Sequence, residues 1–191
     1  STPKPSSAAS DVYKRQDIDV AVLFGDGRFR QGESHWLFSE EVFPVCSPLL
    51  LKDRAAPLPA PSLLELPLLH LRGEGSNHWF DWSGVFRELG LAGAPAPGQL
   101  RFDNYTLLIQ AAIGGQGVAI GWRHLVDDLL EQGLLCRPIA ESALSAYGYY
   151  VVLPQRKRRG PLIQRFVDWL MSEQAGSAQS LKGLALPSIA R

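Results

Sequence analysis

The stretch of sequence that most constrains the fold is residues 101–122, which read RFDNYTLLIQAAIGGQGVAIGW. Arg101 and Phe102 are expected to end a short strand. Asp103 or Asn104 then offers a side-chain oxygen to the free backbone N–H groups at the start of a helix. Apolar residues recur at helical spacing along that helix and should form its buried face: Leu107, Leu108, Ala111 and Ala112.

A glycine-rich turn follows this helix. Residues 114–117 (GGQG) should stop it, because glycine takes the left-handed conformation at a helix C-terminus at little steric cost. The short, β-favouring run VAI at 118–120 returns the chain to a sheet at once. Tight strand–helix–strand connections favour a parallel sheet. The helix N-terminus and the C-terminal ends of the strands then share one edge, where open α/β sheets bind ligands.

Composition excludes several classes of protein. With 191 residues, 46% hydrophobic and 20% charged, the chain has the make-up of a globular protein with a real core. Its formal net charge is zero, so no overall field draws it to nucleic acid or to a membrane. No apolar run approaches the roughly 20 residues that span a bilayer. Two cysteines are too few for a disulfide framework, which favours a reducing, cytoplasmic location.

Other elements are expected on both sides of the central unit. Residues 17–24 (DIDVAVLF) have the pattern of a strand buried on both faces, and 147–153 (YGYYVVL) that of a strand rich in aromatic and β-branched residues. Helices are expected from Asn77 through Leu89, from about 123 to 131, and from Pro161 onward.

Two extended pieces contain proline and are expected to cross between two lobes. Residues 42–46 (VFPVC) hold Pro44, and residues 134–139 (LLCRPI) hold Pro138. Because proline lacks the N–H that a central strand needs, neither piece should be an ordinary central strand. The expected layout is residues 1–16 as a disordered or non-native leader, 17–43 with 140–174 as lobe I, 44–139 as lobe II with the crossing strands at its ends, and 175–191 as a flexible tail.

The ordered series in residues 101–122 resembles the effector-binding domain of LysR-type transcriptional regulators: a polar helix start, small and apolar residues, G-x-G, a short strand and a closing Trp. Gly121-Trp122-Arg123 and Gly148-Tyr149-Tyr150 are similar to the glycine-cleavage activator subgroup. The resemblance spans about residues 17–173. It implies an α/β, two-lobed periplasmic-binding-protein-like (type 2) domain with two crossover strands. Lobe I would be incomplete, because such regulators carry a winged helix–turn–helix, a linker helix and the first strand and helix of lobe I before this point.

The helix start at Asp103, Asn104 and Tyr105 is the first candidate ligand site. Orphan N–H groups and the helix dipole there suit a carboxylate or another anion, although a plain N-cap is the alternative. The resemblance implies that this helix start belongs to the effector site. Asp103 stands where the family often has a small hydroxyl residue, and an acid would repel an anion, so the chain departs from the acid-binding version.

Three other segments hold candidate ligand contacts. Gly121-Trp122 follow a strand end, where the indole could wall in a ligand or fill the core. The loop Gly25-Asp26-Gly27-Arg28 follows the first strand, and Arg28 could pair with a carboxylate or be solvated. The resemblance also implies ligand contacts through backbone and hydroxyl groups at the first crossing, at Val45, Cys46 and Ser47.

Cys46 and Cys136 lie on the two expected crossing strands, which should be neighbours. Two reduced thiols are the preferred interpretation, and a regulatory disulfide is the alternative. The four histidines show no metal-binding spacing, so neither a metal nor a cofactor is expected. The run 156–159 (RKRR) is expected to be solvated and not to bind phosphate.

The preferred hypothesis is a small-molecule sensor. By resemblance, an amino acid or organic acid would bind in the cleft between the lobes and control transcription. DNA would be contacted only through a helix–turn–helix absent from this chain, in a homodimer or tetramer of the full-length protein and with no membrane contact. The alternative is a free-standing solute-binding protein or a small α/β enzyme using the same cleft. No secretion signal, activated nucleophile or paired carboxylates favour these, so no enzyme is expected. The resemblance places ligand contacts on the absent helix of lobe I, so this chain alone should bind an effector weakly or not at all.

Overall fold

The computed structural model describes residues 18–29, 32–52, 54–72, 79–93, 100–154 and 160–183, with the backbone alone from 174 to 183. Its elements in chain order are β1 (Ala21–Gly25), β2 (Gly32–Val45), α2 (Pro48–Leu51), the 3₁₀ helix η1 (Ala60–Glu65), β3 (Leu69–Leu71), α3 (Trp82–Glu88), β4 (Leu100–Phe102), α4 (Tyr105–Ile113), β5 (Ala119–Trp122), α5 (Asp127–Glu131), β6 (Ala143–Pro154) and α6 (Pro161–Gly183). None of the helices in these ranges is long and apolar enough to cross a membrane.

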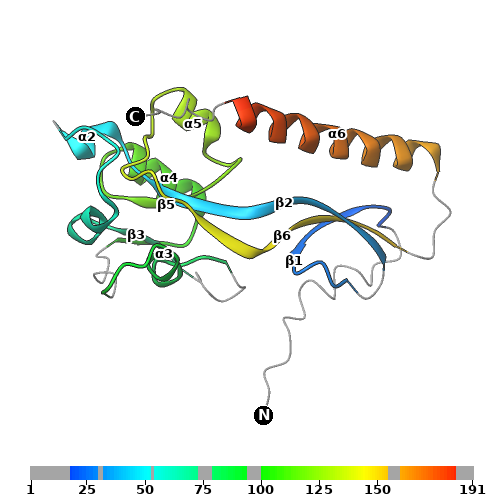
Figure 1. Ribbon diagram of the computed structural model, residues 1–191, viewed down its shortest axis with the longest axis horizontal. Coiled ribbons are helices and arrows are strands. Elements are labelled where there is room, and N and C mark those ends of the chain that lie inside the picture. Colours follow the sequence, from blue (N-terminus) through cyan, green and yellow to red (C-terminus); the bar gives the residue numbers. More distant parts are fainter. Residues whose placement is uncertain are drawn as a thin grey trace, which may run out of the picture. The chain divides into compact units, whose positions relative to one another are not determined.

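The chain divides into two compact units. Unit 1 comprises residues 1–39 and 146–191, and unit 2 comprises residues 40–145. The long strands β2 and β6, cyan and yellow in Figure 1, each have residues in both units. Unit 2 is thus a continuous insertion between two parts of unit 1, close to the segment 44–139 expected as lobe II. The assignment of the units as ligand-binding lobes stays a prediction.

The strands form a mixed arrangement. One sheet has the order β1-β6-β2-β5, and a second pairs β3 with β4. The β3–β4 pair is parallel, and a parallel bridge between Leu68 and Val118 connects the start of β3 to that of β5. Helix α4 therefore links two strands, β4 and β5, between which β3 lies. The parallel arrangement expected around α4 is confirmed.

The two N-terminal strands differ from expectation. The apolar run at 17–24 predicted a strand buried on both faces, but Val22 is 52% exposed and no residue of β1 is fully buried. Residues 32–45 form one continuous strand, in which Pro44 lies opposite Ile120 of β5. Because β2 lies between β6 and β5 in the sheet, the expectation that residues 42–46 are not an ordinary central strand was wrong. Arg123 N–H donates to the Glu41 carbonyl, so by alternation Pro44 falls at a position that donates nothing to β5.

Helix α4 follows its local sequence signals closely. Asn104 caps its first turn, and Gly115 after its last turn has φ +75°, in the left-handed region that glycine adopts without strain. Its buried face is Leu108, Ile109, Ala111 and Ala112, whereas Leu107 is 61% exposed. The expectation of a buried Leu107 is thus wrong, because the helix turns that side chain outward and buries Ile109 in its place.

The other helices differ from expectation at their ends. Helix α3 begins at Trp82, where Asp81 Oδ1 accepts a hydrogen bond from Gly84 N–H at 2.6 Å; the expected cap Asn77 lies outside the described residues. Helix α5 begins at Asp127 and not near residue 123, because the chain first makes a turn in which His124 has φ 70°. Helix α6 extends through Gly183, into the segment expected to be flexible.

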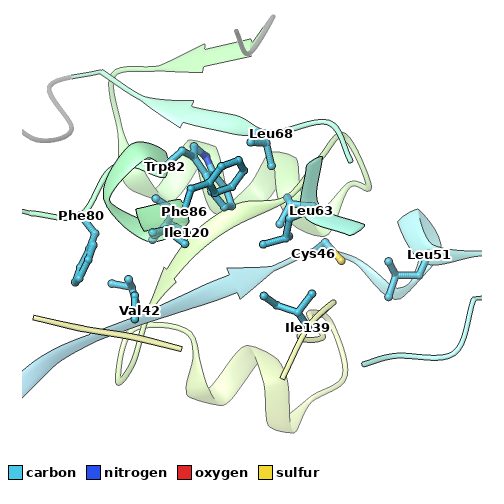
Figure 2. Packing of buried hydrophobic residues seen from close by; sticks show 13 residues of the cluster. Val42, Cys46, Leu51, Leu63, Leu68, Phe80, Trp82, Phe86, Ile120 and Ile139 are labelled. Carbon is cyan, nitrogen blue, oxygen red and sulfur yellow. The ribbon is translucent and has the colours of Figure 1, made fainter. Parts of the chain in front are cut away.

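Unit 2 holds two hydrophobic clusters, one on each face of the β2–β5 pair, because successive side chains of a strand alternate between its faces. Val42 and Ile120 belong to the first cluster, and Phe43 belongs to the second, with α4. In the first cluster the Trp82 and Phe86 rings meet edge to face, 6.0 Å apart (Figure 2). Unit 1 has its own cluster, which joins β2, β6 and α6 through Leu37, Val151, Leu153 and Val167.

Candidate functional site

The N-terminus of α4 lies directly after β4, as the sequence predicts. The Asn104 side chain accepts a hydrogen bond from Leu107 N–H at 3.3 Å and so acts as the N-cap. Asp103 instead pairs with Arg72 Nε at 3.0 Å, and both side chains are about 70% exposed. The helix start thus presents a neutral cap next to an exposed, weakly paired carboxylate.

Tyr105 joins the start of α4 to the end of β5. Its hydroxyl oxygen accepts a hydrogen bond from Trp122 N–H at 3.3 Å and lies 3.5 Å from the Ile120 carbonyl oxygen. The Tyr105 and Trp122 rings meet edge to face with centroids 5.3 Å apart. Burial raises the pKa of Tyr105 to about 12, so the hydroxyl stays protonated at neutral pH. The sequence-predicted residues Asn104, Tyr105 and Trp122 are therefore brought together.

A buried carboxylate completes this group. Trp122 Nε1–H donates to Glu40 Oε1 at 2.8 Å, and Glu40 is 1% exposed. Burial raises the pKa of Glu40, although hydrogen bonds from Trp122, the Ser145 side chain and the Phe80 backbone partly oppose this. Glu40 therefore fixes the position of the indole ring against which Tyr105 packs.

Glu41 follows Glu40 in β2, and Arg123 follows Trp122 at the end of β5. These two residues form a second polar contact, on the other face of the sheet. The Arg123 guanidinium donates to both Glu41 carboxylate oxygens, with distances of 2.5 and 2.7 Å. Burial acts to raise the pKa of Glu41, but hydrogen bonds from Arg123 and Ser142 and the positive charges of Arg123 and Arg137 together outweigh it and lower that pKa. The guanidinium groups of Arg123 and Arg137 lie 5.4 and 4.4 Å from the Phe43 ring centroid.

The candidate ligand contacts at the first crossing segment (residues 42–46) and the residue after it are buried in the core. Val45 and Cys46 are 0% exposed and Ser47 is 3% exposed. The Ser47 hydroxyl accepts from Leu49 N–H at the start of α2, and Ser47 N–H donates to the Ala112 carbonyl. A Cβ at Gly121 would lie 2.8 Å from Val45 Cγ1, so Gly121 permits close packing there. Ligand contact by these residues stays a prediction.

The loop after β1 belongs to unit 1. Asp26 Oδ1 accepts from Arg28 N–H at 3.0 Å, and Asp26 Oδ2 lies 3.9 Å from Arg28 Nε. The Arg28 side chain is 90% exposed, which agrees with the alternative that Arg28 is solvated. A Cβ at Gly25 would meet the Phe29 ring at 3.0 Å. A ligand role for Gly25, Asp26 and Arg28 also stays a prediction.

Comparison with known proteins places the chain in a family. Residues 2–175 match the family model described as the LysR substrate binding domain. The chain belongs to this family. The match starts earlier than residue 17, where the resemblance was expected to begin. The resemblance to the LysR effector-binding domain and the α/β periplasmic-binding-protein-like (type 2) fold are thereby confirmed.

Relatives of this LysR domain include two from Escherichia coli (strain K12). The HTH-type transcriptional regulator DsdC is 29% identical over 165 residues, covering 84% of this chain and 52% of DsdC. The glycine cleavage system transcriptional activator is 30% identical over 167 residues, covering 87% of this chain and 53% of the activator. The X-ray structure of the effector domain of AmpR from Pseudomonas aeruginosa superposes with a TM-score of 0.66 at 25% identity, covering 92% of this chain and 78% of that one. The chain spans about half the length of these curated relatives.

Sequence reasoning did not identify the two acids that organise this LysR domain around β5. Glu40 and Glu41 stand together in an otherwise apolar part of β2, which is the signal that could have drawn attention to them. Their partners Trp122 and Arg123 are equally adjacent, 82 residues further on. Within the described residues, no group of His, Cys, Asp or Glu side chains could hold a metal ion.

Proposed function

We propose that this chain is the effector-sensing part of a LysR-type DNA-binding transcriptional regulator. The match to the LysR substrate binding domain over residues 2–175 is the observation that carries the proposal. Two relatives are by name a transcriptional regulator and a transcriptional activator, and the AmpR structure is of an effector domain. The chain would bind a ligand and not transform it. DNA binding would reside in another part of a dimeric or tetrameric protein that acts in the cytoplasm.

The effector contacts proposed here are the start of α4 and the residues packed against it. The N–H groups at a helix N-terminus and the helix dipole attract a carboxylate. The cap at Asn104 is neutral, so it does not compete for that charge, and the Tyr105–Trp122 pair offers ring edges beside it. These features support a small ligand with a carboxylate at one end.

The exposed carboxylate of Asp103 favours a ligand that also carries a positive charge. Asp103 is paired with a surface arginine, Arg72, and its side chain is 71% exposed. Such an exposed pair is worth about 0–1 kcal/mol, so a ligand cation can replace Arg72 beside Asp103 at little cost. A purely acidic ligand would be repelled, whereas the ammonium group of an amino acid would be attracted. An amino acid therefore fits better than a simple organic acid.

Coupling to DNA binding would come from the effector's different affinity for two states of the regulator. Such coupling typically amounts to about 1–3 kcal/mol, or roughly 5- to 150-fold in affinity. A ligand with equal affinity for both states would change nothing, however tightly it bound.

Nuclear magnetic resonance of the 191-residue chain with ¹⁵N labelling tests the proposal and detects weak binding. The titrants are single amino acids and small organic acids. An amino acid should shift the indole signal of Trp122 and the backbone signals of residues 104 and 105, leaving the α6 indole of Trp169 unchanged. The Trp122 signal is assigned with Trp122→Phe. If a titrant shifts signals elsewhere in the chain but leaves those of residues 104, 105 and 122 unchanged, the proposed contacts are wrong.

Two cap-preserving variants isolate the charge effect. Asn104→Ser and Asn104→Asp both retain a good N-cap, but only the second adds a negative charge at the helix start. Asn104→Asp should weaken binding of the responding amino acid at least several-fold more than Asn104→Ser. Asp103→Asn should weaken amino acids relative to organic acids. Equal effects of the two Asn104 variants would mean that the ligand carboxylate lies elsewhere.

A further inference from the structure

Cys46 and Cys136 are paired by the backbone across two segments that are distant in sequence. Cys46 N–H donates to the Cys136 carbonyl at 3.0 Å, and Cys136 N–H donates to the Cys46 carbonyl at 2.8 Å. They are thus an antiparallel pair that exchanges both hydrogen bonds, as was expected for neighbouring crossing segments. In such a pair the Cα atoms lie about 5.5 Å apart, within the range of roughly 4.4–6.8 Å that a disulfide spans.

The two side chains also lie on the same side of this pair. The Sγ atoms are 3.9 Å apart, and both cysteines are free thiols. Side-chain rotation alone is needed to bring the sulfur atoms to bonding distance, because the backbone spacing already suits the bond. The two cysteines of the sequence are thus paired by the backbone and also have side chains that face each other, an arrangement that chance contact alone would not produce.

We infer that Cys46 and Cys136 are an oxidation site, at which hydroperoxides convert the two thiols into an intramolecular disulfide. The inference is independent of the proposed effector, because it concerns only the thiol pair and its oxidant. It adds a covalent modification to a chain in which sequence alone favoured two permanently reduced thiols.

The two cysteines differ in accessibility, and this sets the order of the steps. Cys46 is 0% exposed within the first hydrophobic cluster (Figure 2), whereas Cys136 is only partly buried. The Cys136 thiolate attacks the distal oxygen of the hydroperoxide and the O–O bond breaks. The distal oxygen stays on Cys136 as a sulfenic acid, and the rest of the hydroperoxide leaves as an alcohol or as water. The Cys46 sulfur then attacks the sulfenic sulfur and water leaves. One hydroperoxide thus takes up the two electrons and two protons that the thiols lose.

The two reduced thiols have low reactivity. Burial raises the pKa of Cys46 to about 12 and also raises the pKa of Cys136. Both sulfurs are therefore thiols at neutral pH, and only the thiolate is an effective nucleophile. The reaction should consequently need sustained exposure to hydroperoxide. Proximity of the second sulfur then favours the disulfide over further oxidation of Cys136.

Cross-linking would join two points that the sequence separates widely. Cys46 directly follows β2, and Cys136 lies between α5 and β6. The bond would close most of unit 2 into a covalent loop and make this contact independent of its two backbone hydrogen bonds. An oxidised chain should therefore unfold at a higher urea concentration than the reduced chain.

The experiment exposes the reduced chain to hydrogen peroxide, blocks remaining thiols with N-ethylmaleimide under denaturing conditions, and maps peptides by mass spectrometry. The expected product is a monomer lacking two hydrogens, with a linked peptide containing Cys46 and Cys136 that dithiothreitol releases. Three outcomes would overturn the inference: both thiols still alkylated after prolonged exposure, Cys136 over-oxidised beside an intact Cys46, or disulfide-linked dimers alone.

Two single variants test the order of the steps. With dimedone present, Cys46→Ala should accumulate the sulfenic acid adduct on Cys136, several-fold more than the wild type does. Cys136→Ala should leave Cys46 as an unmodified thiol, because Cys46 is buried. A dimedone adduct appearing first on Cys46 would contradict this order. The wild-type peptide map decides the main question even if the buried Cys46→Ala substitution impairs folding.

Discussion

The Arg123–Glu41 pair offers a quantitative test of how unit 2 is held together. In Arg123→Met, the methylene part of the side chain is kept and the guanidinium is lost. Glu41 is 19% exposed, so its carboxylate would be left largely buried without the guanidinium of Arg123, and Ser142 and the charge of Arg137 would stabilise it in part. Breaking a buried pair costs about 3–5 kcal/mol, and breaking an exposed pair about 0–1 kcal/mol. With one fifth of each side chain exposed, we expect a loss of about 2–3 kcal/mol at pH 7.

The chain contains a matched control. Arg72→Met makes the same chemical change in the ion pair with Asp103, whose side chains are 70 and 71% exposed. The expected cost there is below about 0.5 kcal/mol. Glu41→Gln and the double variant with Arg123→Met complete a double-mutant cycle, for which we expect a coupling energy of about 1–2 kcal/mol. Urea unfolding followed by tryptophan fluorescence measures all of these differences.

The pH dependence gives this prediction a second, independent readout. The pKa of Glu41 is lowered in the folded protein, so its stabilising contribution is present above the unfolded value, about 4.3, and is lost as the pH falls through the folded value. The stability difference between wild type and Arg123→Met should therefore shrink as the pH falls below about 4. The reasoning fails if Arg123→Met costs no more than Arg72→Met at pH 7, or if its cost is the same at pH 7 and in acid.

Two further predictions concern single side chains. Leu108→Ala should cost about 2–5 kcal/mol of unfolding free energy, because the side chain is 2% exposed, whereas Leu107→Ala on the same helix, 61% exposed, should stay within about 0.5 kcal/mol by urea unfolding. Glu40 has a raised pKa, so the wild type should lose stability as the pH rises from the unfolded value through the folded one, and Glu40→Gln should lack this loss. A constant stability difference between Glu40→Gln and wild type from pH 4 to pH 8 would contradict the assignment.

The parts of the fold that sequence predicted well depend on neighbouring residues. The cap at Asn104 and the left-handed Gly115 act within a few residues of the helix ends that they define, so α4 was placed correctly. The burial of Leu107 was wrong because Leu107 and Ile109 both suit an apolar face. Which of them is buried is decided by the strands packed on the helix, and these come from other parts of the chain.

The polar organisation of the candidate site depends on long-range pairing, and sequence patterns did not reveal it. A Glu in a strand is usually taken for a solvent-facing residue, and nothing near Glu40 identifies Trp122 as its partner. The group at Asn104, Tyr105 and Trp122 was predicted because a helix start and a strand end meet there in α/β folds. The carboxylate behind the indole emerged only with the pairing of β2 and β5.

The register between β2 and β5 is also fixed by two neighbouring polar pairs. Glu40 and Glu41 are adjacent in β2, and their partners Trp122 and Arg123 are adjacent as well. Each strand places one member of a polar pair on either face of the sheet, and Val42 lies opposite Trp122. Sliding one strand by a single residue would point every side chain to the opposite face. Because the two acids are adjacent, such a slip would move one of them into the place of the other, beside that residue's donor, and would leave the second acid without a donor. During folding, a β2–β5 pair that is misaligned by one residue would therefore carry an uncompensated acid, and the native alignment, which gives each acid a donor, would be favoured.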